Sequence, residues 1–203
     1  METVAVIDFE TTGMSPLLGD RPTEIAVALV CDGRIVGRYQ SLMNARRHIP
    51  ADITRLTGIT NAMVAGAPPA AAVMRQAALF VGGRPIVAHN ASFDQRFWRA
   101  ELERLDMDGT GAFACTMLLS RRLYPAFPNH RLSTVVRALA LPVPGRAHRA
   151  MVDAEMTSHL WCRLAQDVRM NYGVDTVTHA LLSKAQRVPR AHLPRLLSAE
   201  AAA

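Results

Sequence analysis

Apolar positions along the chain alternate between short continuous runs and longer stretches with helical spacing. Residues 3–8 form the first short run and predict a central strand. Residues 24–31 and 34–43 lie on either side of the turn Asp32-Gly33, which predicts an antiparallel hairpin. Further short strands are predicted over residues 84–88 and 113–115.

Helices are predicted where apolar residues recur every three or four positions or where glycine and proline mark helix ends. The predicted ranges are 51–57, 70–81, 92–105, 116–124, 131–139 and 149–171. Three early strands followed by alternating helices and strands predict an α/β domain with a mixed five-stranded sheet flanked by helices.

Composition indicates a compact protein. Half of the 203 residues are apolar, so the chain can bury a substantial core. No apolar run is long enough to span a membrane, and the chain enters a strand at once, so we expect neither a membrane helix nor a signal peptide. The three cysteines, Cys31, Cys115 and Cys162, match no zinc spacing and predict ordinary thiols in a reducing, cytoplasmic compartment.

Basic residues exceed acidic ones and give a net charge of +6, with Lys184 the single lysine among the 23 basic residues. This balance favours polyanionic partners through phosphate contacts but does not identify them.

Acidic side chains follow three of the predicted strands or turns. Asp8 and Glu10 lie two positions apart at the end of the first apolar run, so both carboxylates would project to one face if the strand continues through them. Unpaired, they would repel each other, whereas a hard divalent cation would relieve the repulsion. The alternative is a solvated strand end with two unrelated acids. Asp94 follows the strand-turn at 86–93, and Asp153 follows His148 at the start of the long helix.

Three segments that carry these acids resemble motifs of one enzyme family. The segments are Val6-Ile7-Asp8-Phe9-Glu10-Thr11-Thr12-Gly13, Val87-Ala88-His89-Asn90-Ala91-Ser92-Phe93-Asp94, and His148-Arg149-Ala150 followed by Val152-Asp153-Ala154. The chain is similar, over residues 4–164, to the DnaQ-like 3′–5′ exonucleases of the DEDDh branch, which include bacterial proofreading subunits and RNA-trimming enzymes. Met14 stands where many relatives carry leucine.

The resemblance implies a ribonuclease-H-like fold and hydrolysis of phosphodiesters with two divalent cations, Mg²⁺ or Mn²⁺. Asp8, Glu10 and Asp153 would hold the cation that activates water. Asp8 would also contact the second cation, with Asp94 acting directly or through water. His148 would take the proton from the attacking water, since its ordinary pKa suits that task near neutral pH.

The resemblance also implies substrate-binding residues. The turn after the first acids would receive the terminal nucleotide, or it is a simple turn. His89 and Asn90 would contact phosphate or sugar, or only fix their turn. Arg149, together with Arg146, would meet phosphates. The predicted substrate-binding residues are Thr11, Thr12, Gly13, Met14, His89, Asn90 and Arg149.

The leading hypothesis is a 3′–5′ exonuclease that removes nucleoside 5′-monophosphates from single-stranded DNA 3′ ends, in proofreading or repair. Trimming of RNA is the alternative, because no residue identifies a site that senses the 2′-hydroxyl. A partner-binding module with an idle site is disfavoured, since all five catalytic positions are filled. A homodimer stays open.

Residues 1–172 are predicted to form the exonuclease domain and residues 173–203 a C-terminal helical extension or tail. Residues 174–185 predict one helix, Pro189 and Pro194 interrupt the segment after it, and residues 199–203 are expected to fray. The tail either packs on the domain, which we favour, or contacts a DNA polymerase subunit through residues 192–197. Truncation after Asn171 is expected to leave hydrolysis intact.

Overall fold

A computed structural model describes residues 2–145 and 148–201. Its five-stranded sheet has the order β3-β2-β1-β4-β5, in which β2 is antiparallel to both β1 and β3, whereas β4 and β5 are parallel to β1. This confirms the predicted mixed sheet. The strands are β1 (Thr3–Thr11), β2 (Pro22–Cys31), β3 (Arg34–Leu42), β4 (Ile86–Ala88) and β5 (Phe113–Cys115).

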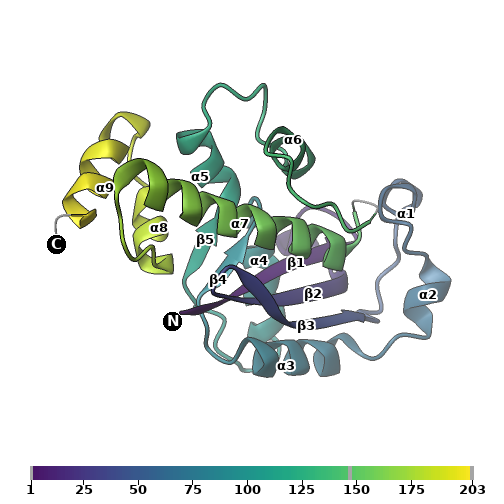
Figure 1. The fold of residues 1–203 in the computed structure, drawn as a ribbon. Helices are drawn as coiled ribbons and strands as arrows, with labels where there is room; N and C mark the ends of the chain where they lie inside the picture. Colours follow the sequence, from purple (N-terminus) through teal and green to yellow (C-terminus); the bar gives the residue numbers. More distant parts are fainter. Residues whose placement is uncertain (1, 146–147, 202–203) are drawn as a thin grey trace.

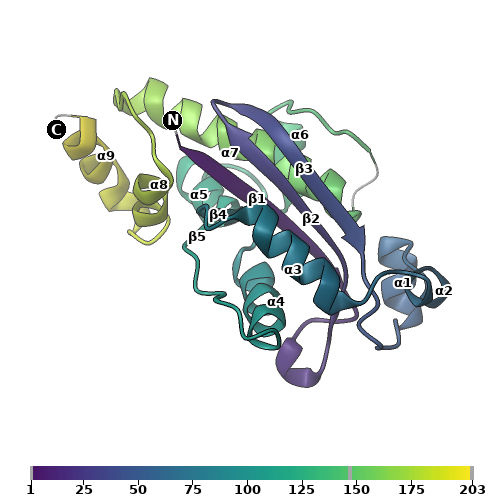
Figure 2. The ribbon, with the colours of Figure 1, turned by 90° about the horizontal axis from the view of Figure 1, so that it is seen from below.

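Helices cover both faces of the sheet. The long helix α7 crosses one face with α5 and α6 beside it, and α3 and α4 cover the other face (Figures 1 and 2). In the described part of the chain, no helix combines the length and apolar character needed to cross a membrane. The helices are α1 (Ala51–Thr57), α2 (Asn61–Ala65), α3 (Ala70–Val81), α4 (Ser92–Glu103), α5 (Thr116–Leu123), α6 (Leu132–Ala138), α7 (Ala150–Tyr172), α8 (His179–Ala185) and α9 (Leu193–Ala201), with short 3-10 turns at Pro16–Leu18 and Arg190–His192.

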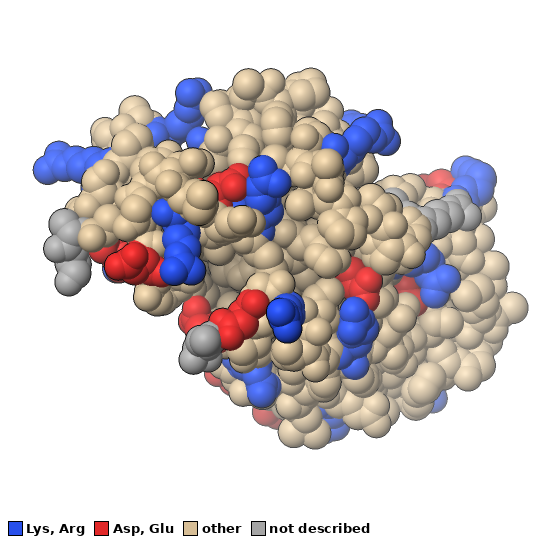
Figure 3. Space-filling view, in the orientation of Figure 1, with Lys and Arg blue, Asp and Glu red and all other residues tan. Residues whose placement is uncertain are grey.

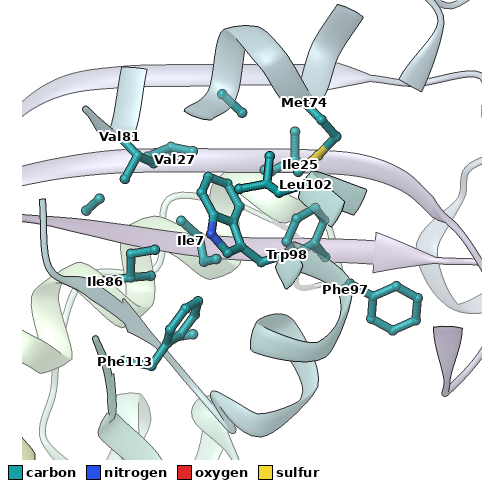
Figure 4. Close-up of a cluster of buried hydrophobic side chains, with 14 of the residues drawn as sticks. Ile7, Ile25, Val27, Met74, Val81, Ile86, Phe97, Trp98, Leu102 and Phe113 are labelled. Carbon is teal, nitrogen blue, oxygen red and sulfur yellow. The ribbon is translucent and has the colours of Figure 1, made fainter. Parts of the chain in front are cut away.

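The alternation of side chains along β1 places the candidate acids. Ile7 packs with Trp98 and Leu102 in the core below α3 and α4 (Figure 4). Val4 and Val6 belong to the opposite core, under α7. Because successive strand residues face opposite sides, Asp8 and Glu10 emerge on the α7 side of the sheet, just beyond the apolar packing.

The C-terminal segment differs from its prediction in two places. Helix α8 begins at His179 and not at residue 174, because Gly173, at φ 68°, ends α7 and the Thr178 side chain then caps α8 by accepting from Leu181 N. Pro194 does not interrupt α9, because it lies in the first turn, where no backbone donor is needed. Residues 199–201 are helical, so the predicted fraying is wrong there, and residues 202–203 lie outside the described residues.

The same segment closes one edge of the sheet. The buried Gln186 amide accepts a hydrogen bond from Cys115 N at 2.5 Å and donates one to Phe113 O at 3.1 Å, so it occupies the place of a further strand beside β5. Glu2 accepts from His179 N at 2.7 Å and thereby joins the start of β1 to α8. The tail therefore packs on the domain, as the favoured prediction had it, with its buried apolar residues Leu181, Leu182, Leu193 and Leu197 in the core under α7.

Candidate active site

Three carboxylates meet between β1 and α7. Asp8 and Glu10 come from the carboxyl-terminal half of β1, and Asp153 comes from the first turn of α7. Each offers one oxygen, and the three oxygens lie within 4.8 Å of one another. The site lies toward the end of the molecule that carries α1 and α2, away from α8 and α9 (Figure 1).

Asp94 joins this site from the other side of β1. β4 ends at Ala88, so it pairs with only the first half of β1 and leaves Phe9 N without a sheet partner on that side. Asp94, 2% exposed in the first turn of α4, accepts this N–H at 3.1 Å. The short strand β4 thus makes room for the fourth acid beside the other three.

The crowding of these acids raises their pKa values. Burial, and then the charges of Asp153 and Glu24, raise the pKa of Glu10 to about 8. Burial raises the pKa of Asp94 to about 8, against the opposing effect of the Phe9 N–H. The pKa of Asp8 lies well above its ordinary value because of burial and the nearby Asp94 and Asp153. Without a bound cation, the folded protein therefore favours the neutral, protonated forms of these acids near pH 7.

The donor set fits a hard divalent cation. It consists of carboxylate oxygens from three residues whose mutual spacing allows one ion to touch all of them. Soft sulfur ligands are not among them, and the raised pKa values show that a positive charge here would be stabilising. Asp8, Glu10 and Asp153 would hold one cation, and Asp94 would serve a second beside Asp8.

His148 lies at the exposed margin of the site. Its backbone N–H donates to Asp153 Oδ2 at 2.7 Å, and its φ of 64° is unusual for a residue with a side chain. Burial raises the pKa of Asp153 overall, although the backbone N–H and then the charge of His148 oppose that rise. The structure therefore brings His148 beside Asp153, as the sequence predicts, and leaves its side chain accessible.

The turn after β1 is held by Asp20. The Asp20 carboxylate accepts from Ser15 N at 3.0 Å and from Thr12 Oγ1 at 3.4 Å, and Thr12 Oγ1 accepts from Arg21 N. Thr11 and Thr12 are buried, whereas Met14 is 68% exposed. Of the predicted nucleotide-binding residues, Met14 therefore has a free side chain and the two threonines hold the turn.

Gly13→Ala is expected to lower turnover about tenfold, because an added Cβ would lie 2.5 Å from the Asp20 carboxyl group and would displace it. Steady-state hydrolysis of a labelled oligonucleotide measures the effect. Gly66→Ala is the matched control, since its Cβ meets nothing within 4 Å. Equal activity of both variants would show that the turn tolerates displacement of Asp20.

His89 and Asn90 lie in the turn between β4 and α4. His89 Nε2 lies 2.9 Å from His130 O, so it must carry the proton, and Nδ1 then accepts from Thr116 Oγ1 at 2.9 Å. Both ring nitrogens are occupied by the protein, and burial lowers the pKa of His89 to about 4. Asn90 is exposed at φ 64°, and its carbonyl accepts from Phe93 N. The His89 ring therefore fixes its turn, whereas contact of the exposed Asn90 side chain with phosphate or sugar stays a prediction.

His89 is expected to make the fold sensitive to acid. Its folded pKa of about 4 lies below the ordinary 6.5, so the unfolded chain binds more protons between these values. Stability from this residue is complete above pH 6.5 and falls by about 3 kcal/mol as pH drops to 4. Urea unfolding at pH 7 and pH 4.5 measures this, with His89→Gln as control. An equal pH dependence in the variant would contradict the assignment.

A fifth acid, Glu24, was missed by the sequence analysis. It lies in β2 directly opposite Glu10, is 1% exposed, and forms an ion pair with Arg149. A charged residue inside the apolar run 22–31 was the available signal, because a buried carboxylate requires partners. Arg149, predicted to bind phosphate, pairs with Glu24, and its Nη2 lies 2.9 Å from Glu24 Oε1. Arg146 lies outside the described residues.

Residues 5–160 match the family model RNase_T, described as Exonuclease. The chain belongs to this exonuclease family. The match includes Asp8, Glu10, Asp94 and Asp153, and it confirms the resemblance on which the sequence analysis relied.

Curated relatives of this exonuclease family are longer proteins. A DNA polymerase III PolC-type from Bacillus cereus is 36% identical over 168 residues, which cover 82% of this chain and 12% of the relative. A putative bifunctional exonuclease/endonuclease protein from Mycobacterium tuberculosis is 36% identical over 206 residues, which cover 98% of this chain and 30% of the relative. The chain thus spans less than a third of the length of these two relatives.

Solved exonuclease structures share the fold. Exonuclease X in complex with 5′ overhanging duplex DNA has a TM-score of 0.71 and 29% identity, and the match covers 90% of this chain and 99% of that one. E. coli Exonuclease I in complex with a dT13 oligonucleotide has a TM-score of 0.72 and 19% identity, covering 86% and 43%. These neighbours agree with the ribonuclease-H-like arrangement of the sheet and helices.

Proposed function

We propose that this domain hydrolyses the terminal phosphodiester at the 3′ end of single-stranded DNA and releases nucleoside 5′-monophosphates, with two divalent cations, Mg²⁺ or Mn²⁺. The observation that carries the proposal is the cluster of Asp8, Glu10 and Asp153 oxygens within 4.8 Å of one another. Asp94 lies beside this cluster and accepts a hydrogen bond from the backbone N–H of Phe9, the residue between Asp8 and Glu10. Two bound cations supply charge stabilisation for the attacking and leaving oxygens of a phosphodiester.

The chain's own residues bind and orient the substrate, and one of them moves the proton of the attacking water. The four carboxylates would hold the cations, which would supply charge stabilisation to the reacting phosphate. His148, exposed beside Asp153, takes the proton of the attacking water at an imidazole nitrogen. Met14, exposed on the turn after β1, contacts the terminal base. Thr11, Thr12 and Gly13 keep that turn in place.

DNA is the preferred substrate in this proposal because of the relatives. The PolC-type relatives are DNA polymerases by name, and Exonuclease X was solved with duplex DNA. Surface charge does not help to choose between DNA and RNA, since basic side chains on the face in Figure 3 are scattered among acidic ones. A polymerase partner and a homodimer stay predictions.

The test is cleavage of 5′-labelled single-stranded DNA and RNA of matched sequence in Mg²⁺ or Mn²⁺. A ladder that shortens from the 3′ end and disappears in EDTA is expected, with DNA cleaved faster. Asp8→Asn is expected to abolish the ladder. Asp32→Asn is the matched control, because Asp32 is exposed in the turn at the opposite end of the strands and accommodates asparagine at φ 52°.

Each outcome decides a different point. Faster cleavage of RNA than of DNA would make RNA the substrate in place of the proposed DNA. Shortening from the 5′ end would overturn the polarity. No cleavage of either polymer by folded protein, with the site intact, would favour a partner-binding role over catalysis.

A further inference from the structure

Both carboxylate oxygens of Glu24 are fully used by donors from the protein. Oε1 accepts from Gln40 Nε2 at 2.9 Å and from Arg149 Nη2 at 2.9 Å. Oε2 accepts from Ala150 N at 3.1 Å and from Arg149 Nε at 3.3 Å. A carboxylate offers about four lone-pair positions, two on each oxygen. Glu24 therefore has no position left for a cation, although it lies opposite Glu10 and close enough to raise the pKa of that acid.

Three of these four hydrogen bonds come from the point at which α7 begins. Ala150 N is the first backbone donor of this helix, and Arg149 is the residue just before it. Glu24 therefore fixes the start of α7 to β2 through one backbone bond and a two-point contact with the guanidinium group.

The positions of two groups of the proposed mechanism depend on where α7 begins. Asp153 lies in the first turn of α7, and His148 is the residue before Arg149, with its N–H on Asp153 Oδ2 at 2.7 Å. A shift of the helix start would move both relative to Asp8 and Glu10, which are held by β1. Misplacement by about 1 Å is enough to cost on the order of 100-fold in rate.

We propose that Glu24 and Arg149 form a positioning pair that sets the place of His148 and Asp153 against the acids of β1, and that neither binds the cations or the substrate. This inference rests on the proposed function for its kinetic consequences.

The test uses Glu24→Gln, Arg149→Met and the double variant of the full chain. Gln at position 24 keeps the shape but turns one acceptor oxygen into an amide N–H that faces donors. Each single variant is expected to lower kcat at least tenfold and to change KM for single-stranded DNA by less than threefold. The double variant is expected to be no worse than the worse single, because the two residues act as a unit.

Arg38→Met is the matched control. Arg38 pairs with Glu155 in the second turn of α7 and so also links the sheet to this helix, but its side chain is half exposed and Glu155 has no part in the proposed mechanism. Its kcat is expected to stay within twofold of the parent. Equilibrium binding of Mn²⁺ measured by calorimetry is expected to weaken less in Glu24→Gln, which displaces the ligand Asp153, than in Glu10→Gln, which removes a ligand.

Hydrogen exchange separates this inference from the proposed function. In metal-free protein, Glu24→Gln is expected to speed amide exchange at residues 150–153, and Arg38→Met is not, whether or not the protein cleaves nucleic acid. Unchanged exchange overturns the inference. Loss of Mn²⁺ affinity in Glu24→Gln without faster exchange at residues 150–153 would make Glu24 a ligand, and a raised KM confined to Arg149→Met would make Arg149 a phosphate contact.

Discussion

Glu10→Gln is expected to abolish hydrolysis, by at least 1,000-fold, and to raise the melting temperature of the metal-free protein at pH 7. The folded pKa of Glu10, about 8, lies above the ordinary 4.5, so the folded protein binds more protons than the unfolded chain between these values. The stability from this group is complete below pH 4.5 and is lost as pH rises through 8. A neutral glutamine removes the free-energy cost of ionising this group in the folded protein. A gain of about 1 kcal/mol in the free energy of unfolding corresponds to several degrees in melting temperature.

Thermal melts in EDTA from pH 5 to pH 8 measure this effect. The parent is expected to lose stability relative to Glu10→Gln as pH rises, and added Mg²⁺ should raise the melting temperature of the parent more than that of the variant. Glu103→Gln, at an exposed position of α4, is the control. A variant that is less stable than the parent at pH 7 without metal would show that Glu10 is already neutralised within the protein.

Truncation after Asn171 is expected to prevent cooperative folding at 25 °C. The removed segment buries Leu181, Leu182, Leu193 and Leu197 and pairs with the outer edge of β5 through Gln186. Burial of each leucine contributes about 1.5–3 kcal/mol, and the sum rivals the roughly 5–15 kcal/mol stability of a typical domain. These contacts favour loss of folding over the prediction from sequence, for the same truncation, that hydrolysis stays intact.

Circular dichroism during heating tests the truncation, and Gln186→Ala isolates the edge contact. The point variant is expected to lose about 2–3 kcal/mol, because two buried backbone groups lose their partners. Gln76→Ala, on the exposed side of α3, is the control. A truncated protein that melts cooperatively near the temperature of the parent would contradict the role given to this segment.

Local signals predicted most of the fold correctly. The apolar run before Asp8, the turn Asp32-Gly33, and the glycines after α1 and α3 each determine structure through residues next to one another in sequence. Residues 174–178 were wrongly assigned to α8 because the local N-cap at Thr178, which accepts from Leu181 N, was not recognised. The Glu2 contact with His179, in contrast, depends on the folded chain.

In the candidate site, too, features set by adjacent residues could be predicted and contacts between distant segments could not. Asp8, Glu10, Asp94, Asp153 and His148 were predicted because their motifs are contiguous, and the structure gathers the four acids and places His148 beside Asp153. The partners of Glu24 could not be predicted, since its four donor atoms come from Gln40, Arg149 and Ala150 in distant segments. For the same reason, the sequence could not show that His89 already has both ring nitrogens occupied.

The order in which the chain is synthesised gives the Asp94 contact a further consequence. Phe9 and Asp94 lie 85 positions apart, and Ala150 lies 126 positions from Glu24. The acids of β1 are therefore made early, yet their partners leave the ribosome only after most of the domain has been translated. Contacts of such sequence separation form late and slowly. A growing chain thus carries an incomplete acidic cluster, and the capacity to cut nucleic acid arises only when α7 docks on the sheet.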